Sequence, residues 1–179
     1  MTTFALSLAN IATPKTRFDV HPVLRIFIAL VAITMTALCT YAMAGVIGGF
    51  AAEHPNLSAL PIKLHLMAVL PAIPLGGYLL IAPKGTAMHK QLGKVWVALM
   101  VATAITAVFI RPGGDFSWIH IFVPVTLHGA WKIFATARRG DIAGHKKHLV
   151  TFYLLALTVP GIAAFAIPGR VMNVLTFGW

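Results

Sequence analysis

Five apolar stretches separated by short polar loops constrain this chain more than any other feature. They run over Pro22–Phe50, Ala59–Ala82, Val95–Ile110, Trp118–Ala137 and Leu149–Ile167. A helix of about 20 apolar residues crosses a bilayer, and an open sheet leaves backbone groups unpaired there. We therefore expect an all-α integral membrane bundle of five transmembrane helices, folded as one domain over residues 21–179.

Composition supports a membrane protein and excludes other classes. Only 10% of the 179 residues are charged, whereas soluble domains carry about 25%. The formal net charge of +10 is better explained by basic loops at a membrane surface than by nucleic acid, so no nucleic-acid partner is expected. The single cysteine, Cys39, excludes an internal disulfide and a four-thiolate iron–sulfur cluster within this chain.

Basic residues are divided unequally between the two sides of the expected bundle. Three lie on one side: Lys63, Arg111 and Arg170. Eleven lie on the other: Lys15, Arg17, Arg25, Lys84, Lys90, Lys94, Lys132, Arg138, Arg139, Lys146 and Lys147. Cytoplasmic loops carry the excess of Lys and Arg, which predicts a cytoplasmic N-terminus. With five spans the C-terminus then lies outside.

The two ends of the chain are expected at the membrane surface. The apolar run Phe4–Ala12 is too short to span and has no basic residue in front, which argues against a signal peptide. Residues 1–20 are predicted as an interfacial segment, with a partly ordered tail as the alternative. The apolar, aromatic end Pro168–Trp179 suits an interfacial anchor.

Three histidines lie within the expected spans: His65, His120 and His128. His65 and His120 belong to different helices, both in the outer part of the bilayer. His128 lies eight residues beyond His120, about 12 Å deeper by helical rise. A bis-histidine haem needs two imidazoles aimed inward from two helices of a bundle. The spacing predicts His65 and His120 as an outer pair of iron ligands, and Gly76 with its neighbour Gly77 would let a flat macrocycle approach.

A second cluster of histidines is expected at the inner ends of the third and fifth spans. His89 with His148 or His145 would form an inner pair, for which His128 competes. The alternatives are structural: a histidine in a span can simply hydrogen-bond a neighbouring helix. A basic cluster at the same end suits anionic lipid headgroups or haem propionates. Its members are Lys90, Arg138, Arg139 and Lys147.

Three segments resemble a bacterial family of predicted membrane proteins of unknown function, of the domain of unknown function 2306 type. They are His65–Gly77, KGTAMHKQLGK (Lys84–Lys94) and ARRGDIAGHKKH (Ala137–His148). The resemblance covers the chain from about Pro61 onward and implies the bacterial inner (cytoplasmic) membrane, crossed several times. More distantly, the layout is similar to the ascorbate-reducible transmembrane cytochromes b. That similarity implies one or two haems b held by histidines of alternate helices.

The function expected from the sequence is haem b-binding transmembrane electron transfer, with quinone as an exchange partner. The alternative is a non-catalytic accessory subunit of a larger respiratory or photosynthetic membrane complex, with structural histidines. A third possibility is a carrier for protons, metal or a small solute. All four acids lie outside the expected spans, which weakens that third possibility. No catalytic residue is assigned.

Overall fold

The computed structural model describes residues 21–111 and 113–179, and within these ranges it contains helices and no strand. The all-α prediction is confirmed for this part of the chain. The expected interfacial segment 1–20 lies outside the described residues. The long helices are α2 (Pro22–Gly48), α3 (Leu60–Ile81), α4 (Ala87–Ala107), α5 (Phe122–Arg138), α6 (Ile142–Phe152) and α7 (Val159–Ala166).

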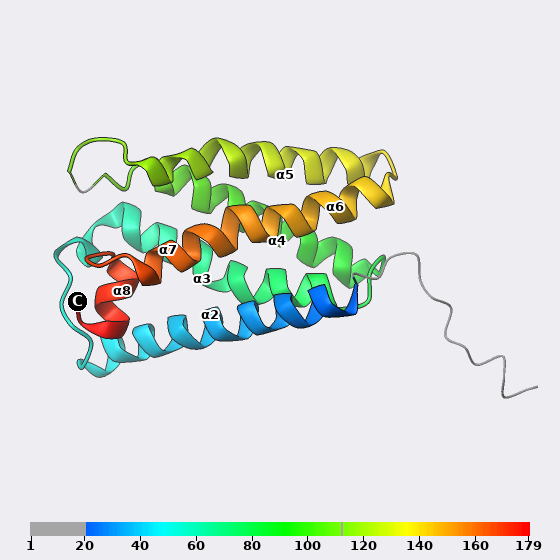
Figure 1. Ribbon diagram of the computed structural model, residues 1–179. Coiled ribbons are helices and arrows are strands. Elements are labelled where there is room, and N and C mark those ends of the chain that lie inside the picture. Colours follow the sequence, from blue (N-terminus) through cyan, green and yellow to red (C-terminus); the bar gives the residue numbers. More distant parts are fainter. Residues whose placement is uncertain (1–20, 112) are drawn as a thin grey trace, which may run out of the picture.

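Short elements complete the chain. The 3₁₀ turns η1 (Pro55–Ser58) and η2 (Trp118–Ile121) precede α3 and α5. The π-helical segment η3 (Tyr153–Thr158) joins α6 to α7, so that one rod runs through all three (Figure 1). α3 packs on α2 and α4, and α5 packs on α4 and α6. The long helices therefore lie side by side as a bundle (Figure 1).

Three helical stretches are long and apolar enough to cross a membrane: Pro22–Gly48, Leu60–Ile81 and Ile142–Ala166. Large apolar side chains on α2, such as those of Phe27 and Ile33, are exposed on the bundle surface, where lipid would cover them. α4 and α5 do not belong to this group. α4 carries two lysines in its first two turns, and α5 has only 17 residues.

Two helices begin earlier than the apolar stretches do. α4 begins at Ala87, where the Thr86 hydroxyl accepts a hydrogen bond from the His89 amide at 3.1 Å. α6 begins at Ile142, where the Asp141 carboxylate accepts from the Gly144 amide at 2.9 Å. Such N-caps stabilise the first helical turn. The loops expected up to residues 94 and 148 are therefore largely helical, because capping extends a helix beyond its apolar face.

Close packing around Trp96 explains the glycine pair of α3. A Cβ at Gly76 would lie 2.6 Å from the Trp96 indole nitrogen, and one at Gly77 would lie 2.5 Å from the Ala32 Cβ. The Trp96 indole N–H donates to the Ala72 carbonyl at 2.9 Å. The space beside the pair is filled by protein. The expectation that these glycines admit a macrocycle is therefore wrong.

The C-terminal helix α8 (Val171–Phe177) packs against α2 near one end of the bundle (Figure 1). It buries Met172, Asn173 and Leu175. The Asn173 side-chain amide donates to the Phe165 carbonyl at 2.7 Å, which links α8 to the last turn of α7. The apolar end of the chain is thus part of the packed bundle and has buried as well as exposed side chains.

Candidate functional site

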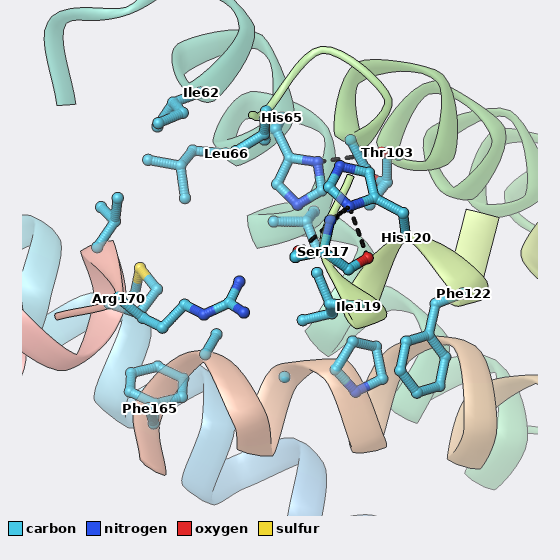
Figure 2. Close-up of a pocket in the computed structure, with 18 of the residues that line it drawn as sticks. Ile62, His65, Leu66, Thr103, Ser117, Ile119, His120, Phe122, Phe165 and Arg170 are labelled. Atoms are coloured by element: carbon cyan, nitrogen blue, oxygen red, sulfur yellow. Dashed lines mark hydrogen bonds between the residues drawn. The ribbon is translucent and has the colours of Figure 1, made fainter. Parts of the chain in front are cut away.

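A cavity of about 590 Å³ opens where α3 and α5 begin and α7 ends. Cavities of 300–1,000 Å³ are typical of small-molecule and cofactor sites. Most of its lining is apolar and comes from helices across the bundle, including Leu66 and Leu70 of α3, Ala104 of α4 and Phe165 of α7. Its polar lining includes His65, Thr126, His120 and Arg170, and Figure 2 shows three of these around one space. The geometry is that of a ligand site.

His65 is partly buried on the second turn of α3. Its Nδ1 lies 3.0 Å from the Thr103 carbonyl oxygen and 3.2 Å from the Thr106 hydroxyl, both on α4. A carbonyl oxygen only accepts, so Nδ1 carries the proton and donates. The lone pair of neutral His65 is then on Nε2. A histidine that ligates a metal is oriented in this way by its other ring nitrogen.

His120 lies in the 3₁₀ turn η2, ahead of α5. Its Nδ1 lies 3.0 Å from both the backbone nitrogen and the carbonyl oxygen of Ser117. Nδ1 can therefore accept from the amide or donate to the carbonyl, according to the tautomer. Its Nε2 is buried without a hydrogen-bond partner in the described structure. An orphaned buried nitrogen is costly, so this atom is suited to a ligand.

Arg170 precedes α8 and extends into the same space (Figure 2). Its backbone N–H donates to the Ile167 carbonyl at 3.3 Å. Its guanidinium has no ion pair within the ranges that the structure describes, although Asp115 also lines the cavity. A guanidinium at the mouth of an apolar cavity suits a ligand that carries a carboxylate. The sequence offered no signal for this role beyond one basic residue on the outer side.

The π-helical segment η3 forms part of the cavity wall. Ala156 and Leu157 from this segment, with Pro160 and Gly161 from α7, line the cavity. Proline lacks an N–H, so Pro160 cannot donate to the carbonyl one turn before it. Within the segment, the Thr158 hydroxyl donates to the Tyr153 carbonyl at 3.1 Å. π-helical turns inside α-helices occur frequently at functional sites.

His89 and His145 form a separate cluster on the first turns of α4 and α6. The His145 Nδ1 lies 3.0 Å from the Ile133 carbonyl of α5 and donates to it. Burial lowers the pKa of His89 below its ordinary value, and the nearby charges of His145 and Lys84 lower this pKa further. Neither histidine lines the large cavity. The structure thus brings these two together without a cavity of cofactor size between them.

His128 and His148 lie together elsewhere, in a hollow of about 210 Å³ between α5 and α6. The His128 side chain is exposed, and its ring centroid lies 5.8 Å from that of Trp131. The expected inner ligands are therefore divided between two places. His89 lies near His145, whereas His148 shares a hollow with His128.

The basic residues expected to bind lipid or propionates lie at the end of the bundle where α4 and α6 begin. All four side chains are exposed, and none lines the large cavity: Lys90, Arg138, Arg139 and Lys147. The Arg138 guanidinium lies over the Phe134 ring, 5.5 Å from its centroid. Within residues 21–111 and 113–179, no group of three or more His, Cys, Asp or Glu side chains could hold a metal ion.

No family model, no curated protein and no solved structure matches this chain. Three histidines and the Arg170 guanidinium line one largely apolar cavity. The His54 Nδ1 accepts from the Asn56 amide and its Nε2 lies 3.2 Å from the Gly169 carbonyl oxygen, which leaves His65 and His120 to meet a ligand. Such a cavity suits a mostly apolar ligand that carries a negative charge.

Proposed function

We propose that this chain is a transmembrane electron-transfer protein that binds one haem b between His65 and His120. One observation carries the proposal. His65 on α3 and His120 in the 3₁₀ turn η2 line a single cavity of about 590 Å³, one oriented to present a lone pair and the other with an orphaned ring nitrogen. Such a haem has only two protein ligands, so a cluster of three or more ligating side chains is not required.

Each residue has a distinct role in this proposal. His65 and His120 would hold the iron through Nε2, and the hydrogen bond from His65 to Thr103 increases the basicity of the ligand. Arg170 would pair with a propionate. The apolar lining excludes water and favours the reduced, less charged state. A bound haem would supply one-electron redox chemistry.

The geometry supports one haem better than two. The cluster of His89 and His145 lies apart from the large cavity, and the hollow beside His128 and His148 has only about 210 Å³. That volume is about a third of the volume of the large cavity. The proposed protein therefore carries its haem at the end of the bundle where α3 and α5 begin.

We also infer that five segments cross the membrane, with the N-terminus in the cytoplasm and the C-terminus outside. α4 and α5 pack between α3 and the rod of α6 to α7, and thus share the bundle with the three apolar spans. Lys90 on the first turn of α4, and Lys146 and Lys147 on the second turn of α6, then lie near the cytoplasmic surface. In this orientation the haem cavity lies in the outer half of the bilayer.

The test is the visible spectrum of the purified protein. A bis-histidine haem is low-spin, and we expect its sharp reduced band and one extractable haem per chain. His65→Ala and His120→Ala should each remove this band, because each variant deletes one of the two side chains that would hold the iron. His128→Ala is the matched control, since His128 lies on α5 outside the cavity, and it should keep the band. A folded, colourless protein would refute haem binding and favour an accessory subunit.

A further inference from the structure

The hollow between α5 and α6 is the strongest feature that the haem site does not use. It holds about 210 Å³ and is lined by Val125, His128, Gly129, Lys132, His148, Thr151, Phe152 and Leu155. α5 comes close to Phe152 at Gly129, because glycine has no Cβ. An added Cβ there would overlap the Phe152 ring. The hollow thus combines polar side chains of α5 (His128, Lys132) and α6 (His148, Thr151) with the Phe152 ring.

The polar groups of this hollow lack hydrogen-bond partners within the described chain. In the described part of the chain neither His128 nor His148 makes a hydrogen bond, and the His128 ring has one ring contact, to Trp131 at 5.8 Å between centroids. The Lys132 ammonium lies 5.1 Å from the centroid of the Trp131 ring. A neutral imidazole always has one N–H to donate. The hollow thus presents at least two unused donors.

The depth of these donors makes their lack of partners costly. His128 lies ten residues before Arg138, the last residue of α5, or about 15 Å by helical rise. His148 lies seven residues after the α6 cap Asp141, or about 10 Å. If α5 and α6 cross the membrane, as proposed above, the His128 ring lies below the headgroups, and His148, which follows Lys147, lies at the inner boundary of the hydrocarbon region. Polar groups at that depth need partners and commonly mark functional sites.

We propose that this hollow binds the ring of a membrane-dissolved quinone. The two quinone carbonyls would accept hydrogen bonds from His128 and His148, and the flat ring would lie beside Phe152. A quinone is neutral, enters from the lipid and only accepts hydrogen bonds, which matches the donors present. The phosphate of a phospholipid lies at headgroup level and does not match the depth of His128. The inference rests on the proposed function: the quinone would be the electron-exchange partner of the haem protein, and His128 and His148 would bind it.

The experiment titrates full-length protein in detergent with a short-chain ubiquinone or menaquinone analogue and follows tryptophan fluorescence. We expect saturable quenching, because Trp131 borders the hollow. His128→Ala and His148→Ala should each weaken binding about tenfold, since each removes one hydrogen bond to the ring. Leu127→Ala is the matched control: Leu127 is exposed on α5 but does not line the hollow, and this variant should bind normally. Trp131→Phe should reduce the quenching while calorimetry still detects binding.

Three results would overturn the proposal. One is quenching that does not saturate and is equal in all variants, because this reports quinone dissolved in detergent. Another is binding that both histidine variants leave unchanged. The third is binding of phosphatidylglycerol in nanodiscs, lost in the same variants while quinone does not bind, since the hollow would then be a lipid site. Haem content separates this inference from the proposed function, because both histidine variants should keep the haem.

Discussion

His65 on α3 donates its Nδ1–H to the backbone carbonyl of Thr103 on α4, across 3.0 Å. This bond determines which ring nitrogen presents its lone pair, because a carbonyl cannot donate. It also joins the two helices that bear one wall of the large cavity. The Thr106 hydroxyl, at 3.2 Å from the same Nδ1, is a second acceptor, since its own proton is directed to the Ala102 carbonyl at 2.8 Å.

Thr106→Val should weaken haem binding about tenfold, because the ligand His65 loses one of two groups that orient it. The rate of haem transfer to an excess of apomyoglobin measures this effect. Thr136→Val is the control, since the Thr136 hydroxyl lies 3.5 Å from the Nδ1 of His145, away from the cavity. Equal haem loss from both variants would indicate general destabilisation and refute a specific role of Thr106.

Arg170→Gln should lower the midpoint potential of the haem. Removal of a positive charge beside the site favours the oxidised state, which is the more positive of the two. A spectroelectrochemical titration measures the shift. Arg111→Gln serves as the control, because Arg111 lies on the same side over the Phe116 ring, 5.1 Å from its centroid, and does not line the cavity. An unchanged potential in Arg170→Gln would argue against a propionate contact.

Gly76→Ala should lower the free energy of unfolding by about 1–3 kcal/mol, because its Cβ would lie 2.6 Å from the Trp96 indole nitrogen in a filled core. Thermal unfolding in detergent measures the loss. Gly93→Ala is the matched control on α4, with no atom within 4 Å of the added Cβ, and should be neutral or stabilising by up to about 1 kcal/mol. Similar melting temperatures in the two variants would contradict the described packing.

His89 should make the protein less stable in acid. Its pKa is lowered in the folded state by burial, then by His145 and Lys84, so the unfolded state binds the proton more readily. The stability that neutral His89 contributes is present above the ordinary pKa of about 6.5 and is lost as the pH falls through the folded value. The melting temperature of His89→Gln should depend less on pH below about 6.5 than that of the wild type. A steeper dependence in the variant would contradict this.

Reporter fusions should place the turn between α5 and α6 in the cytoplasm and the C-terminus outside. A fusion after Gly140 should be active with a cytoplasmic reporter, because Arg138, Arg139, Lys146 and Lys147 surround this turn. A fusion after Trp179 should be active with an exported reporter. The same compartment for both fusions would rule out a single crossing between Gly140 and the C-terminus, and with it the five-span topology.

Local chemistry determined much of what the sequence predicted. Apolar runs predicted helices long enough to cross a membrane, and the structure has such helices at Pro22–Gly48, Leu60–Ile81 and Ile142–Ala166. This part was predictable because the hydropathy of a segment depends only on its own residues. Depth along the expected helices placed His65 and His120 in the same region, and both line one cavity. Their ligation of haem stays a prediction.

Only the tertiary structure decided which faces of the helices meet. The groups that a side chain meets depend on which neighbouring helix packs against its face. His145 therefore lies near His89, while His148, on the same helix, lines another hollow with His128. For the same reason the space beside Gly76 is occupied by Trp96. Packing between distant segments also brings Arg170, next to α8, to the cavity of His65. Such contacts depend on residues far apart in the chain, so no local pattern encodes them.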